Sequence, residues 1–278
     1  MNADTFNDFA DLALRKTGQF IPSHKSYLIE ARLGPIARRE GFGSMDELAH
    51  CVRARPNPAL EAEIAAALLS KQTRFFREKE RLTRIVSDIL PSRLKASSNG
   101  RARVLCAGGG PGQEVYSLAM LIANEAPAAL NGARIDLLSI DVCKQATERG
   151  RQGDFGHFEV QRGLSIHQLL RHFERQETGD WRISSELRAK VSFRQNNILE
   201  DIAGLGMFDV ILCSDVLTGM AREVRGPAVD ALAAQLAPGG VLLLSGGEVL
   251  PDTSVKLEAS NVFRGTCVEA GTAERAAA

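Results

Sequence analysis

The sequence has no excess charge of either sign and no long apolar run. Its 34 lysines and arginines balance 34 aspartates and glutamates, so net charge gives no argument for binding nucleic acid or an anionic membrane. No apolar stretch approaches the ~18 residues that span a bilayer, and no signal-peptide pattern opens the chain. We therefore expect a soluble, cytoplasmic protein with no membrane insertion and no nucleic-acid partner.

Closely spaced cysteines are also absent. No CxxC motif occurs, and no histidine lies near a cysteine at the spacing of a zinc site. Neither a catalytic triad nor a Walker loop is recognisable. We therefore expect no metal site, and we expect free thiols in a reducing cytoplasm. The dispersed cysteines are Cys51, Cys106, Cys143, Cys213 and Cys267.

What is present begins with a helical pattern over the first ninety residues. Apolar residues recur there at the spacing of one helix face. Gly41 is placed to end one helix, and Ser44 with Glu47 forms a capping-box pattern that opens the next. The predicted helices include 6–13, 29–36, one beginning at 44, 60–68 and 82–89.

The pattern changes near residue 101. Pro91 and the polar run 96–100 predict a linker, so we expect a helical domain over 1–95 and a linker over 96–102. Apolar strands then alternate with helices, which is typical of a parallel sheet covered on both faces. We therefore expect an α/β, doubly wound domain over 103–267.

The expected strands lie at 103–107, 135–140, 190–194, 208–213 and 241–245. The expected helices lie at 113–125, 143–152 and 225–237, the last stopped by Pro238-Gly239-Gly240. The Ala-rich residues 268–278 carry no pattern and are expected to form a disordered tail.

A glycine-rich turn follows the first expected strand. Gly108, Gly110 and Gly112 permit positive φ and let a bulky ligand lie against the main chain. The helix that starts at Gln113 would present unpaired N–H groups to that ligand. This strand–turn–helix pattern predicts binding of a nucleotide-type ligand.

An acidic residue ends the second expected strand. Asp141 can accept hydrogen bonds from both hydroxyls of a ribose. The interval from Gly112 to Asp141 exceeds the usual ~20 residues because a long helix and a loop intervene. The pattern does not separate NAD from S-adenosylmethionine, and a structural turn with a solvated aspartate is the alternative.

The segment Thr73-Arg-Phe-Phe-Arg77 joins two helices. Two adjacent aromatic residues cannot share one helix face, so we expect one phenylalanine to pack while neighbouring polar groups face outward. The alternative to a functional site is a segment that connects two helices, packs in the core and leaves its arginine in solvent.

Four segments occur in order along the chain. They are Thr73-Arg-Phe-Phe-Arg77; Gly112-Gln-Glu-Val-Tyr-Ser-Leu-Ala-Met120; Asp141 followed by Gly153-Asp-Phe155 and Gln161-Arg-Gly-Leu164; and Asn197-Ile-Leu199 with Phe208-Asp-Val-Ile-Leu-Cys213. Together they resemble the signature segments of the CheR-type chemotaxis receptor methyltransferases, which are protein-glutamate O-methyltransferases. The resemblance runs from about residue 17 to residue 265.

This resemblance implies an all-helical N-terminal domain followed by a Rossmann-like methyltransferase domain. A small β-subdomain is expected as an insert around 160–190. The implied reaction moves the methyl group of S-adenosyl-L-methionine to glutamate carboxylates on chemoreceptor cytoplasmic helices, leaving S-adenosyl-L-homocysteine. The implied partner is thus the cytoplasmic domain of a chemoreceptor, and the implied process is chemotaxis adaptation.

The resemblance also assigns residues to the site. Thr73 and Arg77 would lie over the reactive end of the cofactor, and Arg77 would orient the acceptor carboxylate as the catalytic residue. Alignment in a dry site would supply most of the acceleration. The remaining implied cofactor contacts are Gly108, Gly110 and Glu114 in the pocket, Asp141 at the ribose, and Asn197 with Ile198 at the adenine.

Several positions depart from the family pattern. Gly219 stands where the family has a tyrosine beside the transferred methyl, Ser214 where it has an arginine, and Lys71 where it has an asparagine. The stretch between Phe173 and Trp181 is too short for the glycine-rich hairpin that grips a receptor's C-terminal peptide. We therefore expect no tether through such a peptide.

The departures leave two alternatives beside the implied enzyme. The loss of a tyrosine wall would admit water and slow methyl transfer. A divergent, non-catalytic relative that binds the cofactor or a signalling partner is one alternative, and a methyltransferase with another acceptor is the other.

Overall fold

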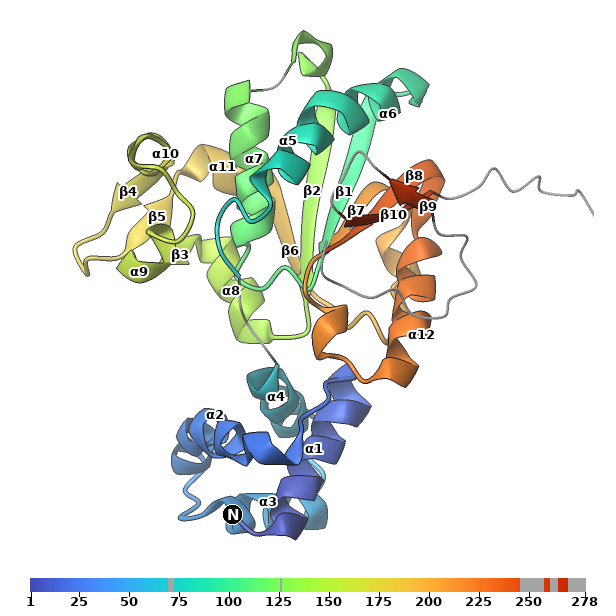
Figure 1. The fold of residues 1–278 in the computed structure, drawn as a ribbon. Coiled ribbons are helices and arrows are strands. Elements are labelled where there is room, and N and C mark those ends of the chain that lie inside the picture. The colour runs from blue at the N-terminus through green and yellow to red at the C-terminus, as the bar shows by residue number, and fades with distance from the viewer. Residues whose placement is uncertain (70–72, 126, 246–257, 261–264, 270–278) are drawn as a thin grey trace, which may run out of the picture.

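The computed structural model describes residues 1–278 except 70–72, 126, 246–257, 261–264 and 270–278 (Figure 1). The tail expected over 268–278 lies mostly outside these described residues. Within the described part, no helix is both long and apolar enough to cross a membrane. The chain forms a helical domain beside a larger domain built on a central sheet (Figure 1).

The helical domain packs around its own apolar core. Its helices are α1 (Ala3–Thr17), α2 (Ser26–Arg39), α3 (Met45–Ala54) and α4 (Pro58–Leu68), with a 3₁₀ turn η1 over Ser23–Lys25. Phe9, Ile29, Leu33, Leu48 and Ile64 are fully buried where these helices meet. Side chains cap three helix starts, which satisfies backbone N–H groups that would otherwise lack partners.

The helix predicted over 82–89 is longer than expected and belongs to the other domain. It comprises α5 (Lys79–Arg84), a π-helical stretch η2 (Ile85–Ile89) and α6 (Leu90–Ala96). Pro91 therefore does not end this helical run. It lies in the first turn of α6, directly after the π-helical stretch, where the missing N–H and the ring of proline are tolerated.

The packing of this helical run shows which core it joins. Phe75, Leu82, Ile85 and Leu90 are fully buried in one cluster with the sheet residue Val104. The helices of the first domain bury their apolar faces in a separate cluster. The two cores thus divide ahead of Thr73, between α4 and α5, rather than at the linker expected over 96–102.

The central sheet has seven strands in the order β6-β2-β1-β7-β8-β10-β9. The first five in this order are parallel, and β10 and β9 add antiparallel strands at one edge. The strands are β1 (Arg101–Ala107), β2 (Arg134–Asp141), β6 (Val191–Gln195), β7 (Phe208–Cys213), β8 (Leu236–Leu244), β9 (Glu258–Ser260) and β10 (Gly265–Glu269). The doubly wound fold expected from the sequence is confirmed.

Alternate side chains of β1 enter cores on opposite faces of the sheet. Val104 and Cys106 pack on the face covered by α5, α6 and α7 (Gln113–Glu125), whereas Leu105 and Ala107 pack on the face covered by α12 (Arg222–Ala233). The remaining helical segments of the sheet domain outside the insert are η3 (Ala128–Leu130), α8 (Lys144–Gln152), η4 (Ala203–Leu205) and η5 (Leu217–Gly219).

Helix α12 ends four residues earlier than predicted. Strand β8 already begins at Leu236, opposite Phe208, and the next register pair joins Val210 to Val241. Pro238-Gly239-Gly240 therefore forms a bulge inside the strand instead of a helix stop. Arg93 of α6 holds this bulge through the carbonyl oxygens of Pro238 and Gly239.

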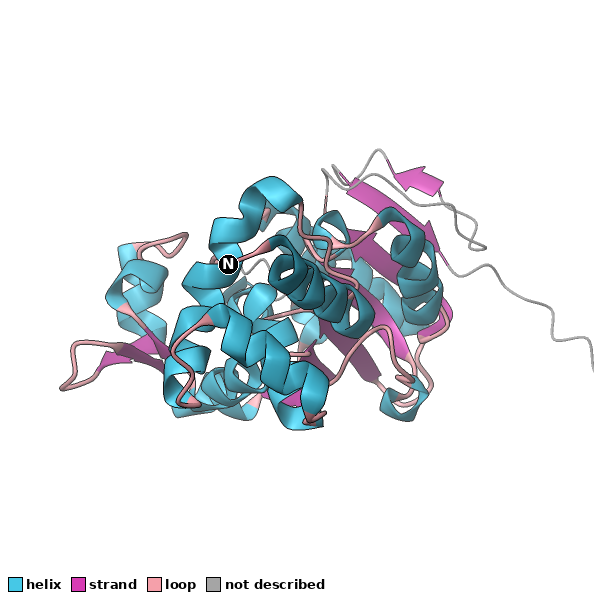
Figure 2. Cartoon of the chain, turned by 90° about the horizontal axis from the view of Figure 1, so that it is seen from below, coloured by secondary structure: helices cyan, strands magenta, loops and turns pink. Residues whose placement is uncertain are grey.

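A small subdomain is inserted after α8, as the family resemblance implied. Its three-stranded antiparallel sheet has the order β3-β5-β4 and lies at the opposite end of the molecule from β9 (Figures 1 and 2). Its elements are β3 (Asp154–Phe155), α9 (His157–Val160), α10 (Ile166–His172), β4 (Phe173–Arg175), β5 (Trp181–Ile183) and α11 (Ser185–Ala189). It begins somewhat before the expected 160–190.

Candidate functional site

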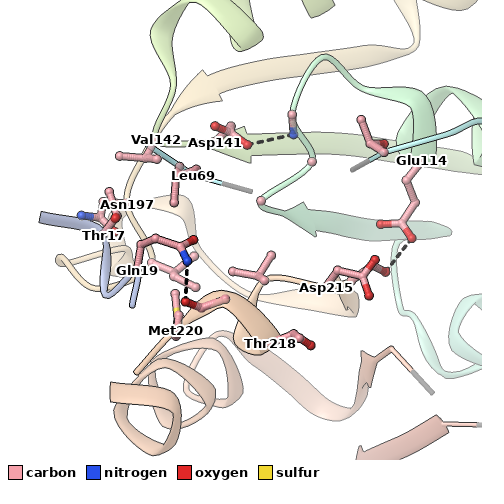
Figure 3. A pocket seen from close by; sticks show the side chains of 18 of the residues that line it. Thr17, Gln19, Leu69, Glu114, Asp141, Val142, Asn197, Asp215, Thr218 and Met220 are labelled. Carbon is pink, nitrogen blue, oxygen red and sulfur yellow. Dashed lines mark hydrogen bonds between the residues drawn. The ribbon is translucent and has the colours of Figure 1, made fainter. Parts of the chain in front are cut away.

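A cavity of about 520 Å³ lies between the helical domain and the carboxyl ends of the parallel strands (Figure 3). Small-molecule sites usually occupy ~300–1,000 Å³. The loops after β1, β2, β6 and β7 line the cavity, which is the expected ligand position in a doubly wound sheet. All the predicted cofactor residues line it: Thr73, Arg77, Gly108, Gly110, Glu114, Asp141, Asn197 and Ile198.

The three predicted glycines have positive φ but serve different needs. A Cβ on Gly108 would lie 2.4 Å from Val216, and one on Gly112 would lie 2.6 Å from Phe193, so both are required by packing. A Cβ on Gly110 would meet nothing nearer than 3.8 Å. Gly110 thus leaves bare main chain along the cavity, where a flat ligand can approach the backbone.

Asp141 ends β2 and joins two loops of the cavity. Its Oδ2 accepts a hydrogen bond from the Gly110 N–H at 2.9 Å (Figure 3). Its Oδ1 accepts one from the Cys143 N–H at 2.8 Å. A carboxylate accepts about four hydrogen bonds, more than these two backbone donors use. This anchored carboxylate suits the ribose contact that the sequence predicted.

Glu114, in the first turn of α7, belongs to a buried polar network. Its Oε1 accepts a hydrogen bond from the Ser214 hydroxyl at 2.6 Å and lies 3.3 Å from a guanidinium nitrogen of Arg81. Burial raises the pKa of Glu114, while the Arg81 charge and the Ser214 hydroxyl act in the opposite direction. Arg81 also donates to Ser214 at 2.7 Å, so the three side chains fix one another.

The segment from Thr73 to Glu78 is a turn, because Phe76 and Glu78 both have φ of +50°. The expectation that only one phenylalanine packs is wrong: Phe75 and Phe76 are both buried, since the left-handed backbone turns both rings inward. The Phe76 N–H donates to the Ser117 hydroxyl at 2.8 Å. The turn is thereby fixed at the mouth of the cavity.

Arg77 leaves this turn toward the cavity and forms an ion pair with Asp215. Asp215 follows β7 and has φ of +57°, a conformation that aspartate and asparagine tolerate better than most residues. Both side chains are about a third exposed. The predicted catalytic arginine therefore already faces a carboxylate of its own chain.

Asn197 and Ile198 lie at the other end of the cavity, after β6. The Asn197 amide donates to the carbonyl oxygen of Lys16 at 2.6 Å, and its Oδ1 accepts from the Leu199 N–H at 3.1 Å. Ile198 is buried in the core on the α12 side of the sheet. Asn197 thus joins the sheet domain to the end of α1.

Other side chains occupy the space at two positions that depart from the family pattern. The Arg81 guanidinium reaches Ser214, and the Gln19 amide lies against Gly219. Lys71, the third departure, falls outside the described residues.

The sequence reasoning missed three site residues. Arg81 gave no signal, because it stands among charged residues (Lys79-Glu-Arg-Leu-Thr-Arg84) that are typical of an exposed helix surface. Asp215 directly follows Ser214, one of the positions that depart from the family pattern. Gln19 gave no signal, because it meets the cavity only through the contact between the end of α1 and the loop after β7.

Together these features define a nucleoside-binding site in a Rossmann-like domain. The fold supplies a strand–glycine turn–helix unit, a bare main-chain surface at Gly110 and a strand-end acid at Asp141. The class is that of a nucleoside-cofactor-binding protein with a helical domain beside its cavity.

Comparison with known proteins identifies the family. The description "CheR methyltransferase, SAM binding domain" matches residues 71–264, and "CheR methyltransferase, all-alpha domain" matches residues 4–69. The chain belongs to the CheR methyltransferase family, whose cofactor is S-adenosylmethionine. The two matches meet near residue 70, where the two cores divide.

Its relatives span nearly the whole chain. Chemotaxis protein methyltransferase Cher2 of Pseudomonas putida is 26% identical over 247 residues, covering 88% of this chain and 90% of the relative. Chemotaxis protein methyltransferase 1 of Pseudomonas aeruginosa is 29% identical, covering 90% and 91%. Among solved structures, PKMT2 from Rickettsia typhi has 17% identity and a TM-score of 0.38, covering 63% of this chain and 26% of that one. That structural likeness is too low to inform the site.

Proposed function

We propose that the protein transfers the methyl group of S-adenosylmethionine to glutamate carboxylates on the cytoplasmic helices of a chemoreceptor. The observation that carries this proposal is the match of both family domains, in order, over nearly the full chain. The cavity supports it, because the residues assigned to the cofactor by resemblance all line that one space.

The residues present fit the cofactor. Asp141 would hold the ribose hydroxyls, Asn197 and Ile198 would lie beside the base, and the bare backbone of Gly110 would allow close approach. When bound, S-adenosylmethionine supplies an electrophilic methyl group to a carboxylate that is already nucleophilic. The chain needs no general base for such an acceptor, so its residues act by alignment and by excluding water.

Arg77 has the chemistry to orient the acceptor. Its guanidinium can hold a carboxylate by charge-assisted hydrogen bonds, and a hydrogen bond from the Phe76 N–H to Ser117 anchors its turn. A strong ion pair would weaken the nucleophile, so Arg77 would position the carboxylate rather than activate it. The network around Glu114 would keep the neighbouring wall in place.

Calorimetric titration with S-adenosylmethionine, followed by assay of base-labile methyl esters on a receptor cytoplasmic fragment, tests the proposal. We expect binding and ester formation. Absence of binding would contradict both an enzyme and a cofactor sensor. Binding without ester would instead favour a non-catalytic relative or a different acceptor.

The Asp141→Ala variant tests the cofactor assignment. We expect it to abolish detectable binding of S-adenosylmethionine, because it removes the ribose acceptor and the anchor of the Gly110 turn. Asp88→Ala is the matched control, since Asp88 is exposed and does not line the cavity. An affinity unchanged by Asp141→Ala would refute the ribose assignment.

A further inference from the structure

The end of helix α1 docks directly on the cavity wall that follows β7. The Phe20 N–H donates to the carbonyl oxygen of Gly219 at 3.0 Å, and the Ala221 N–H donates to that of Gly18 at 2.8 Å. Gln19 and Met220 form an antiparallel bridge between these bonds. The helical domain therefore reaches the cavity through main-chain pairing, which holds residue 19 in a fixed place.

The Gln19 side chain fills the space beside Gly219. Its Nε2 donates to the Gly219 carbonyl oxygen at 2.7 Å and to the Phe20 carbonyl oxygen at 3.1 Å (Figure 3). A Cβ on Gly219 would lie only 2.8 Å from Oε1 and 3.2 Å from Nε2 of Gln19. Gly219 is thus the residue that leaves room for Gln19, and both line the cavity.

These bonds also orient the amide. Because Nε2 donates to two carbonyl oxygens, Oε1 is the polar atom of this side chain that can accept a hydrogen bond. An amide oxygen with a fixed position offers an acceptor to a ligand that carries N–H or O–H groups. The adenosyl moiety and the amino acid end of the cofactor both carry such donors.

We infer that Gln19 is a ligand-binding residue of the cavity, contributed by the helical domain, and that cofactor binding is coupled to docking of the two domains. A ligand that touches both domains stabilises their docked arrangement by the free energy of its contacts with each. The choice of ligand rests on the proposed function, whereas the contact between Gln19 and Gly219 does not.

Calorimetry with S-adenosylhomocysteine tests this inference without turnover. We expect Gln19→Ala to raise Kd about three- to tenfold, the effect of losing one hydrogen-bonding residue of the wall. Gly219→Ala should raise Kd similarly, because its Cβ displaces Gln19. The double variant should bind no more weakly than the weaker single variant, since both changes act on one contact.

Gln145→Ala is the matched control. Gln145 also donates a hydrogen bond between the domains, to Glu63 at 3.3 Å, but lies outside the cavity. Its Kd should stay within about twofold of the wild-type value. If Gln19→Ala does not fold, Gln19→Met keeps the bulk without the amide and should raise Kd at least ~threefold.

Three results would overturn the inference: a Kd for the folded Gln19 variants within about twofold of wild type, additive effects in the double variant, or an equal effect of Gln145→Ala. These outcomes leave the proposed function standing. Failure of the wild-type protein to bind S-adenosylhomocysteine would contradict the proposed function itself.

Discussion

Two ion pairs lie beside the cavity. Arg77 faces Asp215, and Arg81 lies against Glu114. The second pair is deeply buried and fixes the wall, whereas the first is about a third exposed and can exchange partners. An acceptor carboxylate that binds Arg77 must therefore compete with Asp215 for the same guanidinium.

This competition gives a prediction for Asp215→Asn. Asparagine is close in size and tolerates the left-handed backbone at this position, but it releases the Arg77 charge. We expect KM for a receptor fragment to fall about two- to fivefold, the range of a partly exposed ion pair. Kd for S-adenosylhomocysteine, which is net neutral, should change less than about twofold.

Steady-state kinetics with Asp88→Asn as the charge-matched control measure this effect. A rise in KM would show that Asp215 helps to bind the acceptor instead of competing with it.

Among the elements, the inserted subdomain is what holds the Thr73–Arg77 turn in place. The Phe75 N–H donates to the Arg162 carbonyl oxygen at 3.2 Å, and the Phe75 ring packs edge-on against Phe155 and Phe173 at centroid distances of 4.9 and 5.6 Å. The main chain passes so close that a Cβ on Gly163 would lie 1.9 Å from the Phe75 carbonyl oxygen. The insert thus positions Arg77 indirectly.

Gly163→Ala should therefore reduce both stability and ligand binding. The substitution adds a clash with Phe75 to the strain of φ at +105°, and such strain alone costs ~1–3 kcal/mol. We expect a lower Tm and a weaker Kd for S-adenosylhomocysteine.

The Gly179→Ala variant separates the effect of backbone strain from the effect of the clash with Phe75. Gly179 lies between β4 and β5 with φ of +90° and has open space around it, so Gly179→Ala adds backbone strain without a clash. Equal losses of Tm and affinity in the two variants would show that the contact with Phe75 is not what matters.

At the scale of the whole molecule, the two domains have separate apolar cores. The helices of residues 4–69 bury one core, and the helical run 79–96 packs on one face of the sheet in another. Phe75, Leu82, Ile85 and Leu90 contribute fully buried side chains to the second core. Each such side chain stabilises a fold by ~1.5–3 kcal/mol, so the four together contribute ~6–12 kcal/mol, comparable to the total stability of a domain.

Truncation tests this division. We expect a fragment of residues 73–278 to unfold cooperatively on heating, because it keeps its whole core. A fragment of residues 97–278, cut at the linker that the sequence suggested, should lack a cooperative transition. Calorimetry and near-ultraviolet circular dichroism compare the two fragments, and cooperative unfolding of the shorter fragment would contradict the division.

The sequence by itself determined the parallel strands, the glycine turn and the acid at the end of β2. These features are local: an apolar run, a demand for positive φ and a strand end each leave a mark within a few residues. The ordered family segments added the remaining predicted residues of the cavity. Asp141 and Glu114, both predicted as cofactor contacts, line the cavity.

Only the tertiary structure decided which core each helix joins and which partner each cavity residue meets. Periodicity shows that Leu82 and Ile85 share a buried face, but not which surface covers it. The Arg77–Asp215 and Gln19–Gly219 contacts join residues from different loops, and their geometry follows from strand order and domain docking. Physical proximity between such distant residues leaves no mark on a single sequence.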